Sequence, residues 1–150
     1  MAFTGNFVCS SFKQDLLAAR MNFSTSGGHA FKIALYTNVA ALTAATTAYT
    51  ATGEVAAGGG YTTTGLALTT PASMPSLTGT TAWTDFNDAL WASSTITARG
   101  ALIYNDTATT PVADAAVVVL DFGTDKVSSA GDFTVVFPAG DSTNAIIRIA

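Results

Sequence analysis

The scarcity of charged side chains constrains this sequence more than any other feature. Only 11% of its 150 residues are Asp, Glu, Lys or Arg, whereas soluble domains usually carry about 25%. The chain has one glutamate, Glu54, and three lysines, but 28 alanines and 25 threonines. A helical protein normally places Glu and Lys on its solvent faces, and threonine favours strands. The composition therefore predicts a mainly β fold, in a chain long enough to bury a core.

Short strands separated by turn residues are predicted after residue 30. They are rich in β-branched and aromatic residues, and Gly, Pro, Asn and Asp stand between them, Gly123 among these turn residues. The apolar run over residues 117–120 is typical of a central strand covered on both faces. An antiparallel β-sandwich or jelly-roll-like domain is therefore expected over residues 31–150. Its predicted strands span residues 31–36, 62–68, 82–86, 90–92, 95–104, 115–122, 133–137 and 145–149.

Residues 1–30 are predicted to form an N-terminal arm that contains one α-helix, over residues 10–23. Ser11 and Gln14 have the spacing of a capping box, and the apolar residues recur on one helical face. Two placements remain open: the helix packs on the edge of the sheet, or the arm docks on a neighbouring subunit. The apolar face consists of Phe12, Leu16, Ala19 and Phe23.

A long stretch within the predicted sandwich is almost free of charge. From residue 33 to residue 84 the only charged side chain is Glu54, and residues 40–52 are nearly all Ala and Thr. Threonine opposes a helix there. We interpret part of this stretch as a long, ordered excursion between strands, which is uncommon unless it has a function.

The charge balance and the termini exclude several classes of protein. A net charge of −4 argues against a nucleic-acid partner, because six scattered cations cannot neutralise a row of phosphates. The apolar run over residues 115–120 is much shorter than a membrane span needs. The first residues lack a signal-peptide pattern, and the lone Cys9 cannot form an intrachain disulfide. Synthesis in a reducing cytoplasm is therefore expected, without a membrane partner.

Few residues in the sequence suggest catalysis or metal binding. His29 is the only histidine, and no nucleophile motif accompanies it. One histidine and one cysteine cannot supply a zinc site. Aspartates flank two short turns and could in principle bind Ca²⁺, but the EF-hand spacing is absent, so we interpret them as turn formers. We predict no enzyme activity, no cofactor and no metal site; the aspartates are Asp85, Asp88, Asp121 and Asp125.

An uncharged, Thr-rich surface suits a chain that buries part of itself against other proteins. Large aromatic and aliphatic side chains are the usual anchors of such contacts. We expect self-association as a homotrimer, and we take seven residues as candidate interface anchors: Phe12, Leu16, Phe23, Tyr49, Tyr61, Trp83 and Trp91.

Several segments over residues 31–150 resemble a family of small virion structural proteins of tailed bacteriophages. Their motifs are structural and contain no catalytic signature. They are FKIALYT at 31–37, TTAYT at 46–50 with Glu54 and Val55, Gly60 with Tyr61, ITARGALIYN at 96–105, VLDFG at 119–123, GDFT at 131–134 and AIIRI at 145–149.

The resemblance implies a capsid decoration, or cement, protein. Such a protein binds the outer surface of the virion and stabilises contacts between subunits of the major capsid protein. It needs neither catalysis nor a cofactor. Two alternatives remain: a tail, neck or fibre module that binds another virion protein or a host-surface glycan, and a glycan hydrolase that uses carboxylates such as Asp85 and Asp121.

Overall fold

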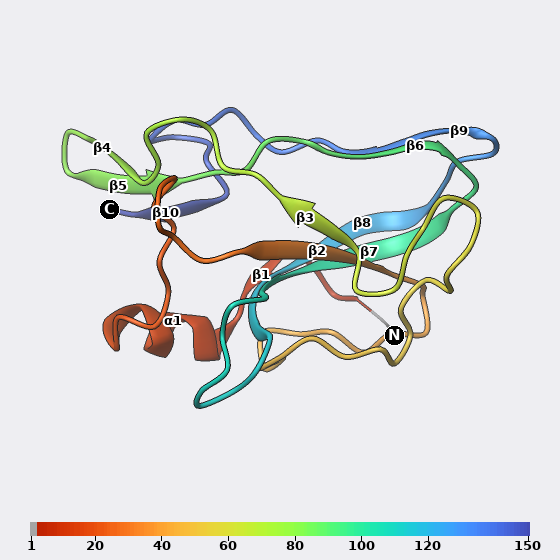
Figure 1. Ribbon diagram of the computed structural model, residues 1–150, viewed down its shortest axis with the longest axis horizontal. Helices are drawn as coiled ribbons and strands as arrows, with labels where there is room; N and C mark the ends of the chain where they lie inside the picture. The colour runs from red at the N-terminus through yellow and green to blue at the C-terminus, as the bar shows by residue number, and fades with distance from the viewer. Residues whose placement is uncertain (1–2) are drawn as a thin grey trace.

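A five-stranded antiparallel sheet forms the centre of the molecule (Figure 1). The computed structural model describes residues 3–150. Across the large sheet the strands are β1 (Phe7–Val8), β8 (Ala115–Val127), β7 (Thr97–Asn105), β2 (Phe31–Tyr36) and β3 (Leu66–Leu68). A second layer, above it in Figure 1, holds two smaller antiparallel sheets: β10 (Ile147–Ile149), β5 (Thr81–Thr84) and β4 (Ser76–Thr78), then β6 (Ala89–Ser94) and β9 (Gly131–Val135). This architecture confirms the prediction of a mainly β, sandwich-like fold.

Both faces of the large sheet are covered near its middle. The upper layer lies on one face, and the helix α1 (Ser10–Leu17) and the chain between β2 and β3 lie below the other (Figure 1). The first five residues of β8 are all buried. A strand covered on both sides has no solvent face and needs no alternation of polar residues. The apolar run over residues 117–120 therefore occupies the kind of strand that its pattern predicts.

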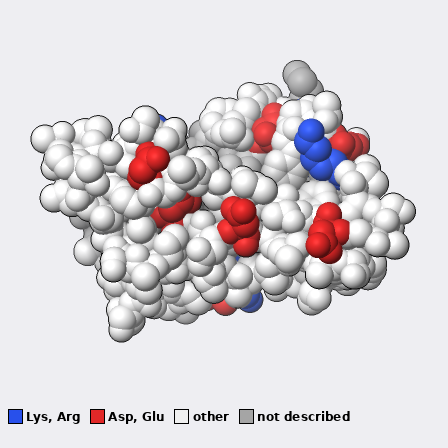
Figure 2. All heavy atoms as spheres, turned by 90° about the horizontal axis from the view of Figure 1, so that it is seen from above, with Lys and Arg blue, Asp and Glu red and all other residues white. Residues whose placement is uncertain are grey.

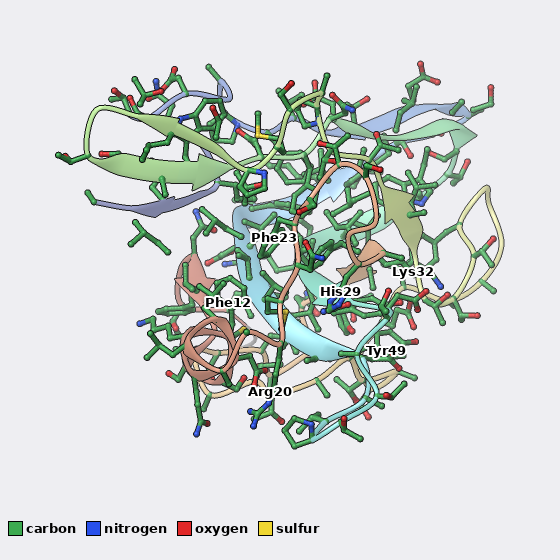
Figure 3. The ribbon with its side chains drawn as sticks, turned by 60° about the vertical axis from the view of Figure 1, so that its left-hand side comes forward. Phe12, Arg20, Phe23, His29, Lys32 and Tyr49 are labelled. Atoms are coloured by element: carbon green, nitrogen blue, oxygen red, sulfur yellow. The ribbon has the colours of Figure 1, made fainter. Side chains whose placement is uncertain are left out.

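Residues 3–30 belong to the same core as the rest of the chain. β1 pairs with β8, Phe7 opposite Val119. The ring of Phe23 stacks on Phe31 at a centroid distance of 4.5 Å. It also meets Phe12 edge-on at 5.9 Å; Figure 3 labels Phe12 and Phe23. Of the two placements considered, the structure has the helix packed within its own protomer. The expected division at residue 30 corresponds to no break in the core.

The helix is shorter than predicted, because it ends at Leu17 and not at residue 23. The N–H of Ala19 donates to the carbonyl of Leu16, and the N–H of Arg20 donates to the carbonyl of Asp15. These two bonds form a Schellman motif, which closes the helix. The predicted capping box is wrong as well: Cys9 occupies the N-cap position without a side-chain bond, and the hydroxyl of Ser11 has no hydrogen-bond partner.

Ala19 adopts a left-handed conformation, with φ 55°, at the position where helices prefer glycine. We therefore expect Ala19→Gly to raise the free energy of unfolding by about 0.5 to 1 kcal/mol, because a Cβ is strained there. Urea denaturation measures the change. Ala18→Gly is the matched control, since Ala18 has an ordinary φ of −87° and the change should destabilise the helix end. Equal destabilisation by both variants would contradict the strain at Ala19.

The strands follow the sequence pattern with three differences. β1 and β4 were not predicted, since each has only two or three residues. The sequence pattern places Gly123 in a turn, but β8 continues past it: residues 122–125 form a bulge, and pairing with β7 resumes at Lys126. β3 begins at Leu66 and not at residue 62. A Cβ on Gly65 would lie 1.9 Å from the carbonyl oxygen of Ile33, so the chain needs glycine there to join β2.

The chain between β2 and β3, residues 37–65, is here called the crossing segment. It is ordered, as predicted, although it contains no named helix or strand. Its backbone bonds to three distant parts of the fold: the carbonyl of Ala44 accepts from Ser10, that of Thr47 accepts from Ala116, and that of Gly59 accepts from Thr95. These bonds hold the crossing segment along the lower face and one end of the sheet.

Candidate functional site

The seven candidate anchors fall into two groups in the structure. Four of them are buried in the core: Phe12, Phe23, Tyr61 and Trp91. The other three, Leu16, Tyr49 and Trp83, are partly exposed. Contact of these side chains with another chain stays a prediction. Of the seven, only the side chains of Leu16, Tyr49 and Trp83 are accessible to a partner in this protomer.

Three of the seven contribute to an apolar hollow at one end of the molecule, between α1 and the β10–β5–β4 sheet. We call it the end hollow; its volume is about 260 Å³. Leu16 and Phe23 come from the helical side, and Trp83 comes from β5. Apolar side chains form most of the wall: Leu16, Met21, Phe23, Pro75, Ile147 and Ile149.

Exposed aliphatic side chains occur in the wall of the end hollow and on the elements that form it. Ile149 in its wall is 58% exposed, and Leu17, next to Leu16 on the helix, is 92% exposed. Across the small sheet, Ile149 pairs with Ala82, and Ala82 pairs with Leu77, which is also exposed. The side chains of such a row share one face. The structure therefore places a group of apolar side chains in solvent at this end, and such groups mark contact surfaces.

The most elaborate polar arrangement surrounds Glu54, the single glutamate of the chain. Tyr49 Oη donates to Glu54 Oε2 at 2.5 Å, and Tyr61 Oη donates to Glu54 Oε1 at 2.7 Å. The backbone N–H of Thr64 donates to Oε1, also at 2.7 Å. Tyr61 Oη in turn accepts from the backbone N–H of Leu35 in β2 at 3.0 Å. The carboxylate thus ties three points of the crossing segment to the large sheet.

The other two tyrosines of the chain complete this group, which we call the tyrosine cluster. Tyr36 Oη donates to the carbonyl of Thr50, and Tyr104 Oη donates to that of Thr64. The ring of Tyr104 lies 5.0 Å from that of Tyr49, centroid to centroid. Each hydroxyl therefore bonds an acceptor of the crossing segment.

Burial raises the pKa of all four tyrosines in the tyrosine cluster. Desolvation, with a smaller effect of the hydrogen bond to Glu54, raises the pKa of Tyr49 to about 12. Desolvation also raises the pKa of Tyr36, Tyr61 and Tyr104 above the ordinary range. Neutral phenols serve as hydrogen-bond donors at pH 7, and a carboxylate is the strongest acceptor for them. The arrangement is therefore a clamp on the crossing segment.

His29 and Cys9 have structural surroundings. His29 Nδ1 lies 2.8 Å from the amide nitrogen of Asn105, whereas a catalytic triad would need a carboxylate at that position. The amide nitrogen of Asn105 also contacts the sulfur of Met21. The Cys9 thiol is fully buried, and desolvation raises its pKa to about 11. A reactive thiol needs the opposite shift.

The four aspartates singled out in the sequence bind backbone or neighbouring groups. Asp85 Oδ1 accepts from the N–H of Phe86, Asp88 Oδ1 accepts from that of Phe137, and Asp125 accepts from Asn38. Burial raises the pKa of Asp85. The N–H of Gly123, followed by the Arg99 guanidinium at 3.1 Å, lowers the pKa of Asp121. Within residues 3–150, no three His, Cys, Asp or Glu side chains converge closely enough to hold a metal ion.

The surface carries few charges, as the composition predicts. Figure 2 shows separate carboxylates and few cations on an otherwise uncharged upper face. In the part of the chain that the structure describes, no helix is long and apolar enough to cross a membrane. The chain matches no protein-family model, no curated protein and no solved structure.

Proposed function

We propose that this protein is a structural protein of a tailed-bacteriophage virion, and specifically a capsid decoration protein. It binds the outer shell and stabilises contacts between major capsid protein subunits, without catalysis or a cofactor. The observation that carries the proposal is the end hollow with its exposed aliphatic surroundings, because it offers adhesion without polar chemistry. The resemblance over residues 31–150 is the reason why we name the major capsid protein as the partner.

Binding to the shell needs no reactive centre. A protein that binds the assembled shell, and not its separate subunits, stabilises the shell by mass action. We further propose that the protein acts as a homotrimer, which places three copies of the adhesive surface on one shell position. If light scattering gave a molar mass of 15.2 kDa, and not three times that value, the trimer would be contradicted.

The double variant Leu17→Asp with Ile149→Asp tests the role of the end hollow. We expect it to weaken binding to purified shells that lack the protein by at least about tenfold, because buried charges without partners oppose an apolar contact. Both side chains are exposed in the protomer, so the fold should persist. Co-sedimentation with the shells measures the affinity.

Val39→Asp is the matched control for this experiment. Val39 is 76% exposed, but it does not line the end hollow. It follows the end of β2 that lies on the opposite side of the molecule from β5 and β10 (Figure 1). Shell binding that is unchanged in the double variant, or reduced equally by the control, would contradict the proposed contact.

The second candidate is a tail, neck or fibre module that binds a virion protein or a host glycan. Trp83 favours it, since this indole is partly exposed and donates to Thr78 Oγ1 at 3.2 Å. Copy number separates the two candidates. A decoration protein should match the major capsid protein in abundance on a gel of purified virions, whereas a tail module should be present in few copies.

A further inference from the structure

Strand β9 has one edge without a partner. It pairs with β6 alone. The carbonyl of Gly131 accepts from Ser94, and the N–H of Phe137 donates to Asp88, both on the β6 side. Because backbone groups of successive residues point to opposite sides of a strand, the groups of residues 132, 134 and 136 point away from β6. No described backbone group bonds to them.

A groove with both apolar and polar walls runs beside this free edge, and its lining includes the charged Asp121, Lys126 and Asp132. Two hollows of about 390 Å³ each share Phe122, Val135 and Val136, and together they extend from Lys126 to Ile146. Leu120, Phe122 and Phe137 contribute apolar side chains to its wall. Val127 and Val136, which also line it, are 67% and 71% exposed. The groove and the unpaired backbone lie side by side.

Other strand edges of the molecule are short or protected. β1 has two residues, and the outer part of β8 is interrupted by the bulge at residues 122–125. The outer side of β6 receives the glycine turn of the crossing segment, where the N–H of Thr95 donates to Gly59. Bulges, short strands and covering loops are the usual protection of an edge. β9 has neither lysine nor proline, and its outer edge is open.

We propose that the groove beside β9 is a strand-acceptor site for an extended segment of a different protein. The segment adds to β9 as a new antiparallel or parallel strand and bonds to the free groups of residues 132, 134 and 136. Its alternate side chains enter the groove, and those that contact Leu120, Phe122 and Phe137 are apolar. The inference goes beyond the proposed virion role and does not depend on it.

A second copy of this chain fits the groove less well. Each named strand of the described chain already pairs within its own protomer, which leaves no strand to donate. Symmetric pairing of two β9 strands would also leave the groove empty, because Phe133 and Val135 point into their own core. The unfilled groove therefore favours a partner with a free segment.

A model peptide tests the site. The probe is a short capped peptide in which valine and threonine alternate between terminal lysines. We expect saturable binding with a dissociation constant below about 1 mM, and slowed hydrogen exchange at the amides of Asp132, Thr134 and Val136. Thr134→Pro should weaken binding at least tenfold, since it removes a free-edge N–H that the protomer does not use. Thr134→Ala keeps this N–H and should bind as the parent does.

The same peptide with every amide between the terminal lysines N-methylated keeps the test independent of protein folding. It should not bind, because neither edge of its backbone can donate a hydrogen bond. Equal binding of the methylated and unmethylated peptides, or no binding of either, would overturn the proposal. A concentration-dependent dimer of the peptide-free protein that Thr134→Pro abolishes would overturn it in favour of a second copy.

Discussion

Replacement of Glu54 by alanine is expected to lower the free energy of unfolding by about 3 kcal/mol. The carboxylate accepts from Tyr49, Tyr61 and the backbone of Thr64. Hydrogen bonds to a charged group contribute roughly 1.5 to 3 kcal/mol each, and their loss is not additive. Removing the acceptor also leaves the buried Tyr61 hydroxyl without its partner. Urea denaturation with an unchanged m-value would give the loss directly.

Two further variants show whether the effect belongs to the clamp. Tyr49→Phe removes one donor and should cost about 1 kcal/mol. Asp125→Ala removes a carboxylate that accepts a single exposed bond, 3.3 Å long, from Asn38, and should change stability by less than about 0.5 kcal/mol. If Glu54→Ala were as mild as Asp125→Ala, the clamp would not hold the crossing segment.

Deletion of residues 1–28 is expected to abolish cooperative unfolding. The deletion removes β1 and three buried phenylalanines, Phe3, Phe12 and Phe23. Burial of each such ring contributes about 1.5 to 3 kcal/mol, and their sum is comparable to the roughly 5 to 15 kcal/mol that stabilises a whole domain. The truncated chain should show poor chemical-shift dispersion and a broad urea transition.

The exposed side of the helix provides the control for the deletion. Lys13→Ala with Gln14→Ala changes two exposed side chains of α1 and leaves the core intact. We expect its stability within about 0.5 kcal/mol of the parent. A truncated chain that kept a sharp transition at the parent midpoint would show that residues 1–28 form a separate arm.

Strands could be predicted from the sequence where the local pattern of side chains alone determines the structure. Residues 31–36 carry aromatic and aliphatic side chains and form β2 with the predicted bounds. The run over residues 117–120 indicated a strand covered on both faces. In such segments burial and backbone preference both favour a strand, so the local sequence pattern is sufficient to predict one.

Other elements depend on contacts that no local pattern contains. The helix ends at Leu17 because the backbone closes through Ala19, a residue type that rarely adopts φ 55°. β1 is a strand only because β8, far along the chain, accepts it. The bulge at residues 122–125 places Phe122 near Phe133, at a centroid distance of 6.3 Å. Tertiary packing therefore determines the end of the helix, the pairing of β1 and the bulge in β8.

The candidate anchors show a similar limit. Large aromatic side chains serve both cores and interfaces, so composition could not separate Phe12 and Trp91, which are buried, from the partly exposed Trp83. In the sequence, Glu54 stands out only as the single charged residue of a long uncharged stretch. A stronger signal was present, because a lone carboxylate between two tyrosines, Tyr49 and Tyr61, in an uncharged stretch needs donors nearby.

The pairing of Phe7 with Val119 has a consequence for biosynthesis. β1 leaves the ribosome long before β8, so the large sheet cannot close until residues 115–127 have been translated. Contacts between such distant residues slow folding and leave unpaired strands exposed meanwhile. A nascent chain with few charges to keep it apart from its neighbours would then depend on chaperones, and its yield should fall steeply as expression temperature rises.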